Sequence, residues 1–289
     1  MSEDTSDIRA ASRTVEGVPV GLVPARRLRL AMRGHLASPG LVSFVTIVAA
    51  ALVWTAVTHL GVVKPLFLPK LESIFAAFLD AVEGRIDGAP LTEHVAMSLV
   101  RVVGAFLLAA LIGIPVGIAT GLSPMLRAVF DPFIEFYRPL PPLAYLPLVI
   151  IWFGIGETSK ILLIFLACFA PVVLAARSGV TAASIDQVNA ARALGASRAQ
   201  VILHVVLPAA LPDILVGLRI GMGVGWTTLV AAEMVAASTG VGQMVLNASN
   251  FLRTDIVLMG IFVIGFFAAV FEFGMRRLER RLVPWKGRM

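Results

Sequence analysis

The sequence is poor in the residues with which enzymes and secreted proteins do their chemistry. Its single cysteine, Cys168, lies within an apolar run, so the chain cannot build a disulfide framework of its own. The four histidines are scattered, and no two have the spacing of metal ligands. No nucleophile elbow, carboxylate pair or Cys–His couple appears. These absences predict a chain that is not an enzyme and holds no metal.

A nucleotide-binding loop is also missing. Residues 154–160, GIGETSK, resemble one superficially but lack the Gly-Lys-Ser/Thr order. Gly221, Gly223 and Gly225 alternate, yet they lie within an apolar run with no strand before them, so they are not a dinucleotide fingerprint. We therefore expect no cofactor on this chain, and no hydrolysis of ATP by the chain alone.

Charge is scarce too. Charged residues make up 15% of the chain and hydrophobic residues 58%, whereas soluble domains have about 25% and about 45–50%. The net charge of +6 comes from basic residues at the ends of apolar runs, which argues against nucleic-acid binding. The composition predicts an all-α protein that lies in a lipid bilayer.

Six apolar segments reach the length of about 20 residues that a membrane-spanning helix needs. They cover about residues 41–60, 95–121, 130–153, 161–180, 214–237 and 256–275. The third opens irregularly at Pro139, Pro141 and Pro142, and lipid tolerates such a stretch only where protein or a water-filled path covers it. Between the first two segments, the helical spacing of Leu71, Ile74 and Phe78 predicts an amphipathic helix on the membrane surface.

The distribution of basic residues predicts the orientation. With a cytoplasmic N-terminus, 17 of the 24 Lys and Arg residues, Arg138 among them, fall in inside segments and five in outside segments. Both termini are then cytoplasmic. Residues 1–40 form a polar, basic leader that we expect to be partly disordered, without a signal peptide. Within it, residues 25–36 read equally as a surface amphipathic helix or as plain flanking charge.

The clearest local pattern lies in residues 184–212. Ser184 with Gln187, and Ser197 with Gln200, have the spacing of capping boxes. Gly195 between them suits the left-handed conformation that ends a helix. Pro208 is expected to stop the second helix. We call residues 184–212 the helix–glycine–helix segment, and the predicted orientation places it in the cytoplasm.

This segment resembles the EAA loop of permease subunits of bacterial ATP-binding-cassette importers. That pattern is Glu-Ala-Ala, three residues, Gly, nine residues, Ile-x-Leu-Pro. Here Asn189 replaces Glu and Val205 replaces Ile, while the spacing and the other positions match. The resemblance continues through residues 141–144, 152–157 and 217–221 and covers about residues 41–285. Within the family, the chain is most similar to the taurine, alkanesulfonate and nitrate permeases, and to the taurine type above all.

The resemblance implies a multi-pass subunit of a bacterial inner membrane. It implies a homodimer that forms one passage, two cytoplasmic ATPase subunits that bind ATP and Mg²⁺, and a solute-binding protein outside. The substrate would be a small anionic or zwitterionic solute such as taurine or a related sulfonate; nitrate and heterocycle precursors stay open. The residues implied in coupling to the ATPase are Asn189, Ala190, Ala191, Leu194, Gly195, Ala196, Ser197, Arg198, Leu207 and Pro208.

Glycines recur at every fourth position in two of the apolar segments. One series is Gly113, Gly117 and Gly121, and the other is Gly217, Gly221 and Gly225. Small residues at this spacing let helix backbones approach closely. The pattern predicts close helix contacts, within the chain or across a dimer; the alternative is a pore constriction or hinge.

Polar residues in the fifth apolar segment are candidates for the solute path, because such residues in a membrane are functional by default. The polar candidates are Arg219, Trp226, Thr227, Thr228 and Glu233, and the apolar Met222 beside them completes the set. Arg219 either reaches back to the membrane surface or makes the passage positive. The threonines and Trp226 either face a cavity or satisfy their own helix and pack.

A transporter driven by ion gradients is the rival from another class. It requires carboxylates or histidines near mid-membrane for proton or sodium coupling. Glu135, Glu157 and Glu233 fall near the ends of the apolar segments instead. The sequence therefore favours the importer subunit.

Overall fold

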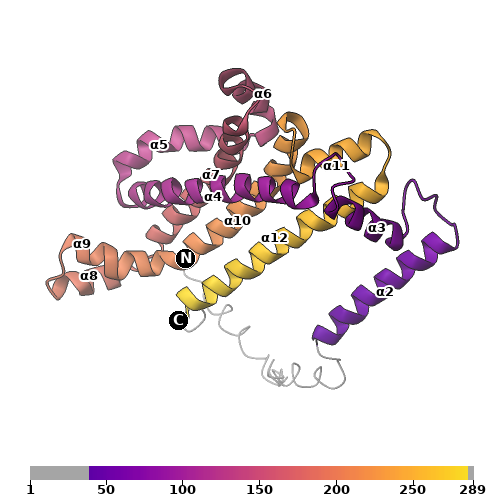
Figure 1. Cartoon of the computed structure of the whole chain (residues 1–289). Coiled ribbons are helices and arrows are strands. Elements are labelled where there is room, and N and C mark those ends of the chain that lie inside the picture. The colour runs from indigo at the N-terminus through magenta and orange to yellow at the C-terminus, as the bar shows by residue number, and fades with distance from the viewer. Residues whose placement is uncertain (1–38, 286–289) are drawn as a thin grey trace, which may run out of the picture. The chain divides into compact units, whose positions relative to one another are not determined.

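The computed structural model describes residues 39–285, and every regular element in that range is a helix, which confirms the all-helical prediction. The chain divides into two compact units after Ala56. Helix α2 (Pro39–His59) supplies the described part of the first unit, and the predicted leader lies almost wholly outside the described residues. The later elements are α3 (Leu71–Val82), α4 (Leu91–Leu122), α5 (Pro124–Tyr137), α6 (Pro142–Phe153), α7 (Glu157–Thr181), α8 (Ile185–Ala193), α9 (Arg198–Val201), the π-helix η1 (Ile202–Val206), α10 (Leu207–Ala236), α11 (Val241–Asn250) and α12 (Thr254–Leu282), as Figure 1 shows.

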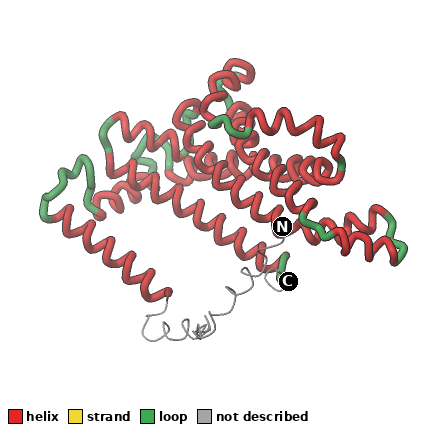
Figure 2. The backbone as a smooth tube through the Cα atoms, turned by 180° about the vertical axis from the view of Figure 1, so that it is seen from behind, coloured by secondary structure: helices red, strands yellow, loops and turns green. Residues whose placement is uncertain are grey.

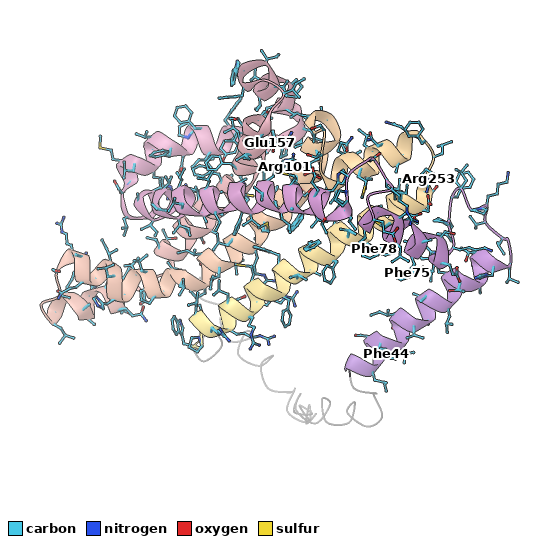
Figure 3. All side chains as sticks on the ribbon, viewed as in Figure 1. Phe44, Phe75, Phe78, Arg101, Glu157 and Arg253 are labelled. Atoms are coloured by element: carbon cyan, nitrogen blue, oxygen red, sulfur yellow. The ribbon has the colours of Figure 1, made fainter. Side chains whose placement is uncertain are left out.

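Within residues 39–285, five helices are long and apolar enough to cross a membrane. They are Gly40–His59, Leu91–Leu122, Glu157–Thr181, Arg198–Ala236 and Thr254–Leu282, and α6 is a shorter apolar helix. In the first of them, large apolar side chains such as Phe44, labelled in Figure 3, are exposed. Such a helix suits a lipid environment, because its apolar residues surround it on all sides.

Residues 130–153, predicted as one segment, are divided between α5 and α6. The chain leaves the helix at Tyr137 and re-enters it at Pro142. Pro139 and Pro141 cause the break, because neither can donate a backbone hydrogen bond. Pro142 is tolerated in the first turn of α6, where its missing N–H would have had no partner.

Helix α7 lies at the centre of the second unit, and both glycine series face it. A Cβ atom added to Gly117 of α4 would lie 2.5 Å from the Val173 carbonyl oxygen. One added to Gly217 of α10 would lie 2.2 Å from the Ala175 Cβ. The prediction of close helix contacts is confirmed, and these contacts join α4 and α10 to α7 within one chain.

The prediction that Pro208 ends a helix is wrong. The turns of α9 pass through η1 into α10 without interruption, and Pro208 lies in the first turn of α10. In η1 the Leu207 N–H donates to the Ile202 carbonyl, five residues back. This wider turn accommodates a residue that has no N–H and whose ring would crowd the preceding turn.

Short helices lie at opposite ends of α7 and α10. Figures 1 and 2 show α8 and α9 at one end and α11 at the other. We call these the α8–α9 end and the α11 end.

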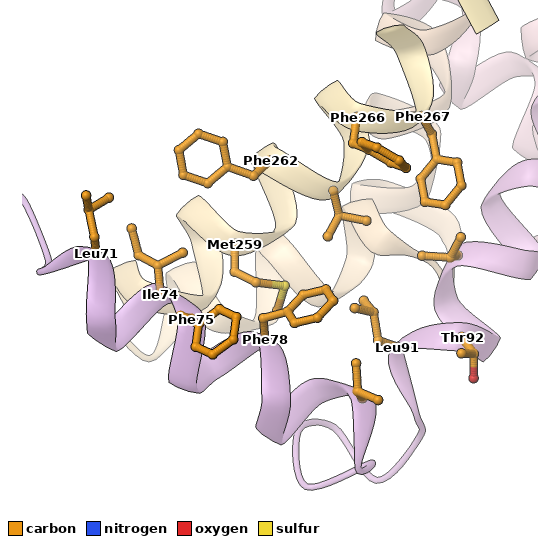
Figure 4. A pocket seen from close by; sticks show the side chains of 13 residues that line it. Leu71, Ile74, Phe75, Phe78, Leu91, Thr92, Met259, Phe262, Phe266 and Phe267 are labelled. Carbon is orange, nitrogen blue, oxygen red and sulfur yellow. The ribbon is translucent and has the colours of Figure 1, made fainter. Parts of the chain in front are cut away.

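The predicted amphipathic helix is present as α3, which buries Ile74, Ala77 and Ala81. Figure 4 shows its apolar face, with Phe75 and Phe78, opposite Met259 and Phe262 of α12 across an apolar cavity of about 630 Å³.

Candidate functional site

Gly195 sets the bend of the helix–glycine–helix segment. Its φ of +84° is in the left-handed region, as predicted, and an added Cβ would meet nothing within 4 Å. The Gly195 N–H donates to the Arg192 carbonyl at 2.9 Å, and the Ala196 N–H donates to the Ala191 carbonyl at 3.0 Å. These two bonds form a Schellman motif, which satisfies the last carbonyls of α8.

Two serines begin the two short helices. The predicted capping box at Ser197 is confirmed: the Gln200 N–H donates to Ser197 Oγ at 3.3 Å, and the Ser197 N–H donates to Gln200 Oε1 at 2.8 Å. The predicted box at Ser184 differs, because Ser184 Oγ accepts from the Asp186 N–H at 3.3 Å instead. Ser184 is therefore a single cap, whereas Ser197 is a reciprocal one.

The helix–glycine–helix segment is anchored on one side and uncovered on the other. Val201 and Val206 are buried against Ala176 and Val180 of α7. In contrast, no residue of α8 is buried, and Leu194 is 90% exposed. A hollow of about 390 Å³ opens beside this bend; it is lined by Ala191, Leu194, Gly195, Ala196, Gln200, His204 and Val205. The structure thus places the implied coupling residues 189–198 on an exposed, rigidly capped surface, with Leu207 and Pro208 half-buried at its base.

The candidate path residues of α10 do not meet in one cavity. Met222 and Trp226 are buried in a core cluster with residues of α4 and α7. Thr227 and Thr228 both donate to the Val224 carbonyl at 2.8 Å, so their hydroxyls are used within their own helix. Met222, Trp226 and Thr228 are buried in the single chain, whereas Thr227 is exposed.

Arg219 makes a bridge between two helices. Its guanidinium donates to the carboxylates of Glu272 and Glu279 on α12. The positive charge is therefore balanced by two carboxylates, and Arg219 ties α10 to α12.

Arg101 lies at the α11 end, where it is 1% exposed and holds two carboxylates. Its Nε and Nη2 donate to the two oxygens of Glu157 at 2.6 and 2.8 Å, in the bidentate geometry that carboxylates favour. Its Nη1 donates to Glu233 Oε1 at 2.8 Å and to the Thr239 carbonyl at 2.6 Å. Figure 3 labels Arg101 on α4 and Glu157 at the start of α7.

Glu233 extends this buried network to α11. Its carboxylate accepts from Ser98 Oγ at 2.7 Å and from the Gly242 N–H at 2.9 Å. An added Cβ at Gly240 would lie 2.5 Å from Glu233 Cδ, so only glycine fits beside the carboxylate. Sequence reasoning did not anticipate this network, although a charged residue inside an apolar helix is a usable signal.

A cavity of about 410 Å³ lies at the break between α5 and α6. It is lined by Tyr137, Arg138, Leu140, Pro142, Tyr145, Leu166, Ala167, Ala170, Pro171, Leu174, Ala175, Ile220 and Val224. The Tyr137 hydroxyl is buried and has no hydrogen-bond partner among the described residues. Arg138, counted from the sequence among the cytoplasmic charges, instead lies beside the central turns of α7 and α10.

Long apolar helices around α7, with paired charges between them, define a multi-pass helical membrane protein. Residues 110–284 match the family of binding-protein-dependent transport system inner membrane components, and the chain belongs to that family. It is the permease subunit of an ATP-binding-cassette importer, as the resemblance of the helix–glycine–helix segment implied.

Individual relatives extend this result over most of the chain. The chain is 53% identical to the taurine transport system permease protein TauC of Escherichia coli K12, over 90% of this chain and 94% of that protein. It is 36% identical to the putative aliphatic sulfonates transport permease protein SsuC of Bacillus subtilis 168, over 81% and 83%. A chain of the MetNI methionine ABC transporter, in an inward-facing conformation, has the same fold, with a TM-score of 0.57, 18% identity and coverage of 66% of this chain and 95% of that one.

Proposed function

We propose that this permease subunit passes a small sulfonate, with taurine as its substrate, along a passage that it forms with a second copy of itself. The observation that carries the proposal is the 53% identity to the taurine permease over 94% of that protein's length. The similarity to an aliphatic sulfonate permease supports the same chemical class.

The helix–glycine–helix segment is the part that receives the ATPase subunit. Its exposed Leu194 and the adjacent hollow offer a surface for a partner, while Val201 and Val206 fix that surface to α7. Lys and Arg are in excess in the segments on the same side of the membrane as the helix–glycine–helix segment. This excess supports a cytoplasmic location for the segment and for both termini. ATP and Mg²⁺ are bound by the partner, not by this chain.

The transport cycle follows from that contact. When ATP closes the ATPase dimer, the two helix–glycine–helix segments move together and the passage opens toward the solute-binding protein outside. Hydrolysis then returns the subunits to the inward-facing state. The contact that differs between the two states is the one between the segment and the ATPase, so it biases the conformational equilibrium.

Uptake of labelled taurine tests the substrate. Cells that lack a taurine permease receive this chain with its own ATPase and binding protein. We expect ATP-dependent accumulation of taurine that unlabelled sulfonates reduce and nitrate does not. Accumulation of nitrate in preference to taurine contradicts the proposed substrate.

Two substitutions test the coupling role. Gly195→Pro and Ala191→Glu are each expected to abolish uptake and transport-coupled ATP hydrolysis while leaving membrane insertion intact. Gly88→Pro is the matched control, because Gly88 also has a positive φ, +71°, with nothing within 4 Å of an added Cβ. Full uptake by the Gly195→Pro protein contradicts the coupling role.

A further inference from the structure

Arg138 differs from three arginines that lie between the helices, because its side chain is exposed in the single chain and lines a cavity. Each of those three arginines forms an ion pair with at least one carboxylate. The pairs are Arg101 with Glu157 and Glu233, Arg177 with Asp131, and Arg219 with Glu272 and Glu279. Arg138 pairs with no carboxylate in residues 39–285. Arg138 lies beside the central turns of α7 and α10. Charged residues at such places in membrane-spanning bundles face cavities and mark ion pathways, so a cation that pairs with no described carboxylate is a candidate to pair with an anion.

A buried hydroxyl without a partner among residues 39–285, that of Tyr137, lies next to Arg138 in the same cavity. The Tyr137 hydroxyl is buried and lacks a hydrogen-bond partner in the described part of the chain. Tyr145 of α6 lines the same space. Buried polar groups are nearly always paired, so the unpaired Tyr137 hydroxyl, beside the exposed guanidinium of Arg138, is a candidate to donate to a bound ligand.

The remaining wall is apolar, with one further acceptor. Ala167 and Pro171 of α7 both line the cavity. Because Pro171 has no N–H, the Ala167 carbonyl one turn earlier loses its usual helical donor. An apolar wall with a few convergent polar groups, in a volume of about 410 Å³, is the ordinary form of a small-molecule site.

The break between α5 and α6 explains why the cavity lies beside the central turns of α7 and α10. Irregular backbone is tolerated at membrane depth where it lines a cavity. The break brings Tyr137 and Arg138 from one helix end to the central turns of α7 and α10. In transporters, binding sites formed at interrupted helices near mid-membrane follow the same physical logic.

We propose that this cavity is a binding site for the sulfonate group of the solute in transit. The Arg138 guanidinium pairs with the sulfonate oxygens, and the Tyr137 hydroxyl donates a hydrogen bond to them. The Ala167 carbonyl and the tyrosine rings face the ammonium group when the solute is zwitterionic. This inference rests on the proposed function and deepens it, because it assigns recognition to the α5–α6 break instead of to the polar residues of α10.

Reconstituted importer with its ATPase and binding protein, in vesicles of uncharged phosphatidylcholine, tests the site. Arg138→Gln keeps a polar side chain but removes the charge, and we expect taurine transported per ATP hydrolysed to fall about tenfold or more. Arg138→Lys keeps the charge and is expected to retain most transport. Tyr137→Phe removes one hydrogen bond and is expected to lower transport about threefold to tenfold.

Arg127→Gln is the matched control. Arg127 is on the same helix, pairs with Asp131 at 3.1 Å and does not line the cavity. Transport equal to wild type in Arg138→Gln and Tyr137→Phe overturns the site. If the wild-type importer carries no taurine, the proposed substrate fails instead, and the two failures are thus distinguished.

Chemical protection supplies a measurement that does not depend on transport. Leu140 lines the cavity and is 39% exposed, so Leu140→Cys offers a thiol to a sulfonate-bearing methanethiosulfonate. The native Cys168 is buried and leaves the background low. We expect taurine to slow labelling in the assembled importer and Arg138→Gln to remove that protection. A labelling rate that taurine does not change contradicts the site.

Discussion

The two ends of the helical bundle are built in opposite ways. At the α11 end, Arg101 and Glu233 are each 1% exposed and join α4, α7, α10 and α11 through a continuous set of hydrogen bonds. At the α8–α9 end, no residue of α8 is buried and Leu194 is 90% exposed. One end is therefore fixed by contacts within the chain, whereas the other leaves its surface exposed, as the proposed contact with an ATPase requires.

This contrast predicts two kinds of mutant. Changes in the interior or at the α11 end remove contacts on which the whole bundle depends, so they lower global stability. Changes at the α8–α9 end alter a locally capped segment, so they loosen that segment and impair coupling while the bundle stays folded.

Glu233→Ala has the largest expected effect, because it leaves part of the buried Arg101 charge unpaired. We expect a loss of about 3–5 kcal/mol in the free energy of unfolding, measured by denaturant titration of the detergent-solubilised protein. Glu72→Ala is the control: Glu72 is 66% exposed and pairs with His59, so we expect about 1 kcal/mol or less. Equal losses in the two variants would refute the structural role of the network.

Gly217→Ala tests the packing of α10 on α7. The added methyl group would lie 2.2 Å from the Ala175 Cβ, so we expect overpacking to cost about 1–3 kcal/mol of unfolding free energy. Gly223→Ala on the same helix meets nothing within 4 Å and is expected to gain about 0.5–1 kcal/mol through helix propensity. The same denaturant titration compares them, and a stable Gly217→Ala protein would contradict the close approach.

Gly195→Ala tests the bend. An added Cβ has open space there, but a φ of +84° strains any other residue, at a cost of about 1–2 kcal/mol. Because the segment is local, we expect faster amide hydrogen exchange in α8 and reduced taurine uptake, with an unchanged global unfolding midpoint. A lowered midpoint with normal exchange in α8 would argue against a locally independent segment.

Ser197→Ala has the smallest expected effect, a loss of about 1 kcal/mol confined to the start of α9. Ser184→Ala should cost less, because Ser184 lacks the reciprocal bond that Gln200 gives to Ser197. Hydrogen exchange of the first turns of α8 and α9 measures both. Equal effects would show that the reciprocal bond contributes nothing.

Sequence reasoning succeeded where structure depends on neighbours in the chain. Gly195 and the Ser197 capping box are set by residues within one turn, so their conformations could be predicted. The amphipathic α3 and the glycine contacts also follow from periodic patterns. Pro208 shows the limit of local rules, because one widened turn in η1 lets the helix continue through it.

Contacts between distant residues could not be predicted in this way. Arg101 lies 56 positions from Glu157 and 132 from Glu233, and only the packing of α4 and α10 on α7 brings these residues together. The prolines located an irregular stretch in residues 130–153, but nothing local indicated that Arg138 would face α7 and α10. Polarity along α10 does not reveal which face of the helix is covered, so the burial of Thr228 and the exposure of Thr227 could not be predicted.

If the helix–glycine–helix segment transmits force from a cytoplasmic ATPase, a thiol introduced by Leu194→Cys must lie on the cytoplasmic side and be covered by that ATPase. Leu194 is 90% exposed, and the one native cysteine, Cys168, is buried. We predict that a membrane-impermeant maleimide leaves Leu194→Cys unlabelled in intact cells, labels it in inside-out vesicles stripped of ATPase, and labels it more slowly once the ATPase is restored. Labelling in intact cells would place the segment outside and contradict the account.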